Sequence, residues 1–102
     1  MSRVVSATIE AQNTFTDALY PAEWVSGFKY GHMNISAQST NWTSLTVTLQ
    51  RSLDREESWE DVESYTENTS KVWTDYEMGV AYRIGVKTGG YNATAVTVRL
   101  GK

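Results

Sequence analysis

Alternation of apolar and polar residues is the main signal in this sequence, and it organises residues 44–62. From Leu45 to Leu49, apolar residues alternate with threonines, which is the period of a strand with one buried and one solvated face. Residues 52–59 have the composition of a turn, and a second strand begins at Trp59. The pattern therefore predicts a β-hairpin at the centre of the fold.

The same alternation predicts further short strands along the chain. It is most regular at residues 80–87, where apolar residues such as Tyr82 and Ile84 alternate with residues such as Arg83 and Lys87. Strands are expected at residues 3–12, 14–16, 28–38, 45–51, 59–66, 71–74, 80–87 and 95–100. About seven short strands with turn signals every 8–12 residues are typical of an all-β antiparallel sandwich. We expect one domain, 1–102, with its core sandwich in residues 28–100 and a less regular N-terminal part in residues 1–27.

The N-terminal part permits two interpretations. Residues 3–12 alternate weakly, with Val5 and Ile9 toward a core and Val4 outward. This segment forms either an edge strand of the domain or an extended arm that adds a strand to a neighbouring subunit's sheet. Pro21 lies in the middle of the segment that follows and favours a loop there over a helix.

Composition excludes several classes of partner. The chain of 102 residues has no cysteine, so it has neither disulfides nor a thiolate site. Its 9 basic and 12 acidic residues give a net charge of -3 without a basic run, so no nucleic-acid partner is expected. The N-terminus does not read as a signal peptide, and no apolar run is long enough to span a membrane. We expect a soluble protein made in a cytoplasm.

No constellation of catalytic or metal-binding residues is recognisable. Seven of the twelve acids lie within residues 54–67, but they lack the glycine of a helix–loop–helix calcium loop. They also share one turn, whereas a glycosidase pair faces across a cleft. His32 is the only histidine and has no evident nucleophile or acidic partner. We therefore expect no enzyme activity, no metal and no cofactor, and we interpret the acids as a solvated edge.

The turn after Leu49 resembles an Asp-box hairpin, Ser-x-Asp-x-Gly-x-Thr-Trp. Ser52, Asp54 and Trp59 match that motif, and Ser58 stands for its threonine. The resemblance implies structural roles, with the Ser and Asp side chains bonded to turn backbone and the Trp packed beneath. Glu56 replaces the glycine, which predicts a distorted turn.

Aromatic residues are more numerous than one small core needs. Exposed rings either stack on sugars or anchor a protein interface, where Trp and Tyr dominate the binding energy. The candidate partner-binding residues combine such aromatics with apolar residues of the N-terminal segment: Val4, Val5, Ile9, Trp24, Tyr30, Trp42, Trp73 and Tyr76.

Two family resemblances follow from the C-terminal half. Residues 80–87, the Gly-containing loop after them and residues 95–100 look like the last two strands of an immunoglobulin-like or fibronectin type III sandwich. Over residues 28–100, the run VTLQRS…SW.DV…YRIGVKTG.Y….VTVRL resembles small virion proteins of tailed bacteriophages. Members of that family usually carry glycines in the Asp-box turn, which this chain lacks.

The phage resemblance implies a non-enzymatic capsid decoration or cement protein that bridges capsid subunits on the virion surface. It implies the major capsid protein, other virion proteins and further copies of this chain as partners. Two alternatives stay open. One is a tail or adsorption-structure protein. The other is a carbohydrate-binding module, which needs a row of coplanar exposed aromatics to hold a surface glycan.

Overall fold

The computed structural model describes residues 3–102, and their regular structure consists of β-strands. The strands are β1 (Val4–Ile9), β2 (Thr14–Phe15), β3 (Glu23–Val25), β4 (Phe28–Tyr30), β5 (His32–Ser39), β6 (Val47–Ser52), β7 (Glu60–Tyr65), β8 (Thr69–Thr74), β9 (Ala81–Val86) and β10 (Val96–Gly101). In the described part of the chain there is no helix that is long and apolar enough to cross a membrane. The prediction of an all-β protein is confirmed.

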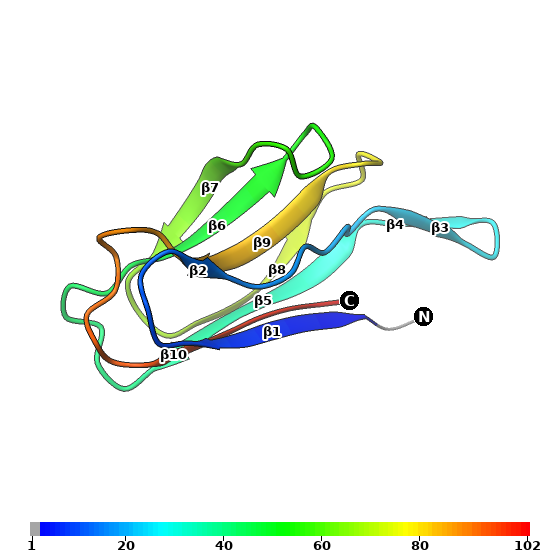
Figure 1. The fold of residues 1–102 in the computed structure, drawn as a ribbon. Coiled ribbons are helices and arrows are strands. Elements are labelled where there is room, and N and C mark those ends of the chain that lie inside the picture. The colour runs from blue at the N-terminus through cyan, green and yellow to red at the C-terminus, as the bar shows by residue number, and fades with distance from the viewer. Residues whose placement is uncertain (1–2) are drawn as a thin grey trace.

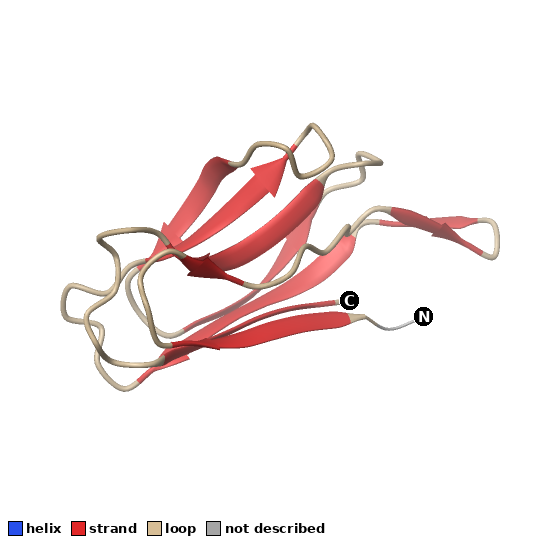
Figure 2. Cartoon of the chain, viewed as in Figure 1, coloured by secondary structure: helices blue, strands red, loops and turns tan. Residues whose placement is uncertain are grey.

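Eight of the strands form two four-stranded sheets that face each other (Figures 1 and 2). One sheet, called sheet A, has the order β1-β10-β5-β8, and the other, called sheet B, has the order β2-β9-β6-β7. Strands β3 and β4 form a separate two-stranded hairpin that projects beyond the sheets (Figure 1). All the pairings are antiparallel, as the short connections predict.

The pairing is nested along the chain. β1 pairs with β10, β2 with β9, β5 with β8 and β6 with β7, so the eight strands form one antiparallel ribbon rolled into two sheets. This is the arrangement of a jelly roll. In a constant-type immunoglobulin sandwich the first and last strands lie in opposite sheets, whereas β1 and β10 here pair within one sheet. The expected immunoglobulin-like order is therefore not found, because alternation within a strand does not specify its neighbours.

A single core lies between sheets A and B. On sheet A, Met33, Ile35 and Ala37 of β5 are buried, and the residues between them point outward. Sheet B contributes Tyr82 and Ile84 of β9. The inward positions predicted for these two strands are confirmed, and apolar residues of both sheets join one cluster. Burial of that cluster is the main stabilising contribution to the fold.

Strand β6 differs from the prediction that one of its faces is exposed to solvent. Thr48 and Gln50 are buried, with 3% and 7% of their surface exposed. β6 lies between β9 and β7, and side chains of those neighbours cover its outer face. Gln50 accepts a hydrogen bond from Arg83 Nε at 2.9 Å and donates one to Asp61 Oδ1 at 2.9 Å. The predicted alternation of β6 is present, but Gln50 on its outer face is buried with both ends of its amide hydrogen-bonded.

The N-terminal segment is an edge strand and not a free arm. β1 pairs with β10 from Val4 to Ile9, and Ile9 is completely buried in the core. The expectation of an extended N-terminal arm is therefore wrong. The inward apolar residues of this segment contribute to the core of the same domain.

The structure has two strands, β4 and β5, where the sequence predicted one at residues 28–38. The strand is interrupted at Gly31, between β4 and β5. The Gly31 carbonyl accepts a hydrogen bond from the Asp75 amide at 2.8 Å. Before the break, β4 folds back on β3 through Ser26 and Gly27, with φ of 51° and 83°. Two central residues with positive φ make the type I′ turn that fits the twist of a two-residue hairpin, and glycine takes such a φ without strain.

Candidate functional site

Large apolar side chains are exposed at one end of the molecule. They lie on the β3–β4 hairpin, at the start of β1, toward the end of β8, and in the loops at residues 53–59 and 75–80, which we together call the hairpin end (Figure 1). Within residues 3–102 they are Val4, Trp24, Phe28, Tyr30, Leu53, Val72, Tyr76 and Met78. The loops at the opposite end contribute none of them. Exposed apolar patches are common at interaction surfaces, so we take the hairpin end as the candidate surface.

The β3–β4 hairpin presents apolar side chains on both faces. Trp24 lies opposite Lys29, and Val25 lies opposite Phe28. Because side chains alternate along a strand, Trp24 lies on one face while Phe28 and Tyr30 lie on the other. Trp24 is 63% exposed and Phe28 is 67% exposed. An isolated two-stranded hairpin has no second layer to cover these rings, so both faces are open to a partner.

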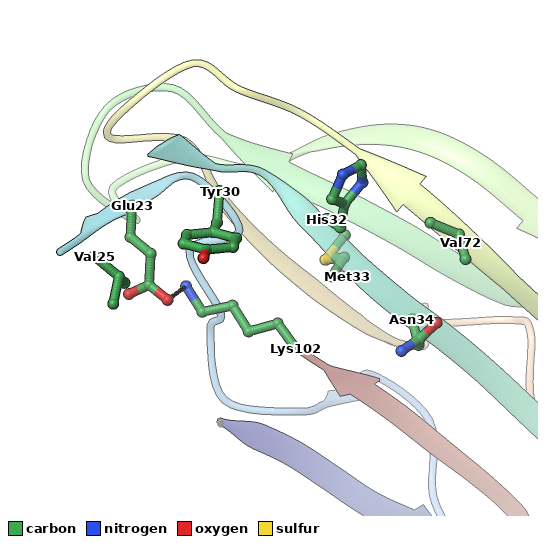
Figure 3. Close-up of a pocket in the computed structure, with 8 residues that line it drawn as sticks. All are labelled: Glu23, Val25, Tyr30, His32, Met33, Asn34, Val72 and Lys102. Atoms are coloured by element: carbon green, nitrogen blue, oxygen red, sulfur yellow. Dashed lines mark ion pairs between the residues drawn. The ribbon is translucent and has the colours of Figure 1, made fainter. Parts of the chain in front are cut away.

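A groove of about 620 Å³ lies between this hairpin and sheet A (Figure 3). Its apolar lining comes from the hairpin, β5 and β8, and its polar lining from the hairpin, β5 and Lys102. The lining residues are Glu23, Val25, Tyr30, His32, Met33, Asn34, Val72 and Lys102. The groove therefore combines one exposed aromatic ring with hydrogen-bonding groups.

An ion pair ties the hairpin to the rest of the domain at the base of the groove. Lys102 Nζ lies 3.1 Å from Glu23 Oε1 (Figure 3), and the Lys102 side chain is only 10% exposed. The same ammonium donates a hydrogen bond to the Tyr20 carbonyl. These contacts join Lys102, just after β10, to the first residue of β3 and to the segment before it.

His32 lies at the rim of the groove and is held on both ring nitrogens. Nδ1 lies 3.1 Å from Thr74 Oγ1, and Nε2 lies 3.1 Å from the Tyr76 hydroxyl. The imidazole and the Tyr76 ring meet edge-on, with centroids 5.6 Å apart. The only histidine therefore orders the Tyr76 side chain on the surface of the hairpin end.

Four of the candidate partner-binding residues lie together at the hairpin end. Val4, Trp24, Tyr30 and Tyr76 are each at least 44% exposed. Sequence reasoning missed Phe28, Leu53, Val72 and Met78. The Ser26-Gly27 pair was the signal that would have revealed a hairpin between two short runs.

The two remaining tryptophans serve mainly to pack the sandwich. Trp42 is half-buried at the opposite end, and its Nε1 donates to Asn68 Oδ1 at 2.8 Å. Trp73 packs edge-on against Tyr82, with ring centroids 6.2 Å apart. Both rings are in contact with the core cluster, so neither is a freely exposed platform.

The last two candidates belong to β1. Val5 is half-buried and packs against the core, and Ile9 has no exposed surface. A partner cannot contact Ile9 while the domain is folded. The exposed part of β1 is its outward row of side chains, beginning with Val4.

The turn at residues 52–59 is held by its own side chains. The Ser52 hydroxyl accepts a hydrogen bond from the Glu56 amide at 2.8 Å, and Asp54 Oδ1 accepts one from the Ser58 amide at 2.9 Å. Hydrogen bonds from the hydroxyls of Ser58 and Ser52 to the carboxylate lower the pKa of Asp54 to about 2. Glu56, which replaces the motif's glycine, takes a φ of 71°. A left-handed conformation at this position therefore persists without glycine.

Trp59 stacks against Arg83 on the outer face of sheet B. The Arg83 guanidinium carbon lies 4.4 Å from the centre of the Trp59 ring and 4.2 Å from that of Phe15. Burial between the two rings lowers the pKa of Arg83 from its ordinary value. The cation joins the edge strand β2 to the start of β7.

Carboxylates of the acidic stretch are paired with cations of neighbouring strands. Glu60 lies 2.5 Å from Arg51, Asp61 lies 2.6 Å from Lys87, and Glu63 lies 2.5 Å from Lys71. Among residues 3–102, no three His, Cys, Asp or Glu side chains are grouped so that they could hold a metal ion. Glu60 and Asp61 form ion pairs on sheet B, and Glu63 joins its edge strand β7 to β8 of sheet A.

Comparison with known proteins assigns no family. No family model, curated protein or solved structure matches this chain. The case for a function therefore rests on the hairpin end and on the resemblance over residues 28–100.

Proposed function

We propose that this protein is a non-enzymatic structural protein of a tailed-phage particle, of the capsid decoration or cement type. It attaches through the hairpin end to the major capsid protein or to another virion protein. The observation that carries the proposal is the gathering of exposed apolar side chains at that end. Such a surface fits a permanent attachment to another protein better than a free existence in solution.

The β3–β4 hairpin supplies the anchor. Trp24 and Phe28 project on opposite faces, so a partner groove that closes on the hairpin removes both rings from water. Aromatic anchors of this kind dominate the binding energy of protein interfaces. Each attachment is modest, but many copies on one shell add together, which is how a cement protein would oppose internal pressure.

Two further lines support the assignment to a particle. The sequence resembles small virion proteins over residues 28–100, and jelly rolls recur among viral capsid domains. The second line is a fold analogy, since one fold hosts many functions. The proposed location is the outer capsid surface, after synthesis in the host cytoplasm. No contact with nucleic acid is expected, because the chain is acidic.

Electron microscopy of assembled particles tests this proposal. A map of particles from the phage that encodes this chain should show its density on the capsid, with the β3–β4 hairpin against a neighbouring subunit. Density on the tail or the adsorption structure would replace the decoration role with the tail alternative. Particles that lack the chain altogether would refute a structural role in the virion.

A surface glycan is a second candidate ligand, favoured by the groove beside Tyr30. The ring of Tyr30 is 48% exposed and lies in the same groove as His32 and Asn34, which supplies a stacking face and hydrogen-bonding groups. Glycan-array binding that is lost on Tyr30→Ala would support this ligand. Trp42→Phe is the control, since Trp42 lies at the opposite end and outside the groove. The groove offers one ring and not a coplanar row, which favours the protein partner.

A further inference from the structure

The four edge strands of the two sheets differ in how they are protected. β7 carries Glu60, Asp61 and Glu63, β8 carries Lys71, and β2 is only two residues long. β1 is six residues long and reads VVSATI, without a charge or a proline, and its register with β10 is unbroken. Charge, proline, bulges and shortness are the devices that keep an edge from pairing with another chain. β1 has none of them.

The hydrogen bonds of β1 identify which residues face the open edge. Arg3 and Lys102 exchange backbone hydrogen bonds of 3.1 and 2.9 Å. Bonded and non-bonded pairs alternate along an antiparallel ladder, so Val5, Ala7 and Ile9 bond to β10. The N–H and C=O groups of the residues between them, Val4, Ser6 and Thr8, therefore point to the edge.

We propose that β1 pairs with β1 of a second copy of this chain, in an antiparallel two-fold dimer centred on Ser6. In this register Ser6 lies opposite Ser6 of the other copy, and Val4 lies opposite its Thr8. These are the residues whose backbone groups point outward, and opposed residues of this kind exchange two hydrogen bonds. The two copies of sheet A then form one continuous sheet with an isologous interface.

Side-chain chemistry supports a second copy as the occupant. Val5 and Ala7 face the core layer but remain half-exposed at the open edge. Antiparallel pairing places Val5 of one copy opposite Ala7 of the other, which buries both. Arg3 and Glu10 flank the strand, and within the described chain neither belongs to an ion pair. In this antiparallel register Arg3 of one copy lies opposite Ile9 of the other, with Glu10 one position further along, whereas parallel pairing would bring like charges together.

The dimer has a consequence for the hairpin end. β1 begins at the hairpin end and runs away from it (Figure 1). A two-fold axis at Ser6 therefore places the two β3–β4 hairpins at opposite ends of the dimer. If the proposed function holds, one dimer reaches two attachment points and bridges neighbouring subunits. The pairing itself does not depend on that function, because it is measured with the purified protein alone.

Proline at Ser6 gives the sharpest test. The Ser6 amide does not bond to β10, so Ser6→Pro should keep the domain folded while removing an outward donor and obstructing the edge. The wild type should show a concentration-dependent mass that rises from 11.5 kDa toward twice that value in sedimentation equilibrium. Ser6→Pro should weaken dimerisation at least tenfold. Should Ser6→Pro fail to fold, Ser6→Lys serves instead, since it opposes two cations across the axis with the backbone intact.

Cross-linking tests the register. The chain has no cysteine, so Ser6→Cys supplies a single thiol that lies opposite its own copy. Mild oxidation should link Ser6→Cys into a disulfide dimer, and Thr8→Cys, which lies opposite Val4, should stay monomeric. A monomer at every concentration would overturn the proposal. A dimer that Ser6→Pro or Ser6→Lys leaves unchanged would also overturn it, because the interface would then lie elsewhere.

Discussion

Lys102 Nζ lies 3.1 Å from Glu23 Oε1, which joins the last residue of the chain to the first residue of β3. The Lys102 side chain is 10% exposed and the Glu23 side chain 34% exposed, so only the lysine is well shielded from solvent. It lies where the projecting hairpin meets the sandwich. The contact joins the strand end after β10 to the hairpin that carries the exposed aromatic rings.

Glu23→Gln should loosen the hairpin. The change leaves the Lys102 ammonium mostly buried without its counter-ion, and we expect a loss of about 1 kcal/mol in the free energy of unfolding. Trypsin cleavage at Lys29, inside the hairpin, should become faster than in the wild type. Glu63→Gln is the control, because its pair with Lys71 is more exposed and should be worth about 0.5 kcal/mol or less. Unchanged cleavage at Lys29 would show that the ion pair does not hold the hairpin.

Ile9→Ala should destabilise the domain strongly, because β1 supplies part of the core. Ile9 has no exposed surface, and truncation of such a side chain costs about 2–5 kcal/mol. Val4→Ala removes a side chain that is 49% exposed, so its effect should stay within about 0.5 kcal/mol. Urea denaturation measures both. A fully stable Ile9→Ala variant would restore the interpretation of β1 as a dispensable arm.

Asp54 should make stability depend on pH in the acid range. Its pKa falls from 3.8 to about 2 on folding, so the folded state favours the ionised carboxylate. The stabilisation is then fully present above about pH 4 and is lost as the pH falls toward about 2. Asp54→Asn should therefore show a smaller loss of stability than the wild type between these two pH values. Parallel pH profiles for the two proteins would contradict the hydrogen-bonding account of the turn.

Arg83→Lys should weaken the outer face of sheet B. A lysine ammonium keeps the charge but loses the planar surface that stacks between Phe15 and Trp59, and it cannot keep the same hydrogen bond to Gln50. We expect a loss of about 1 kcal/mol, measured by thermal unfolding. Lys87→Arg, on the same face but outside the two rings, is the conservative control. Equal stability of Arg83→Lys and the wild type would show that the stacking contributes little.

The sequence predicted burial within strands far better than it predicted their arrangement. The alternation in β5, β9 and β10 identified inward positions correctly, because side chains on a strand must alternate. The alternation did not predict that Gln50, on the outer face of β6, is buried. Its hydrogen-bond partners Arg83 and Asp61 lie on other strands, and the local pattern carries no information about them. It also failed for the order of strands, since short alternating runs do not encode their partners.

The candidate surface was predicted only in part, for a related reason. Residue type alone cannot separate Trp24, which is 63% exposed, from Trp42, which is half-buried. The difference arises because the β3–β4 hairpin extends beyond the sandwich, whereas Trp42 packs against its end. Phe28 lay in a segment that was expected to continue into β5, and only the break at Gly31 moves it to the projecting hairpin.

Co-sedimentation with capsids tests the central claim most directly. Capsids assembled from the major capsid protein of the same genome would be mixed with the wild type and with a Trp24→Ser/Phe28→Ser double variant. Both rings are more than 60% exposed, so the double variant should fold normally and yet bind more than tenfold more weakly, as expected for aromatic anchors. Trp42→Phe at the opposite end should bind as the wild type does. Equal binding of the double variant and the wild type would contradict attachment through the hairpin end.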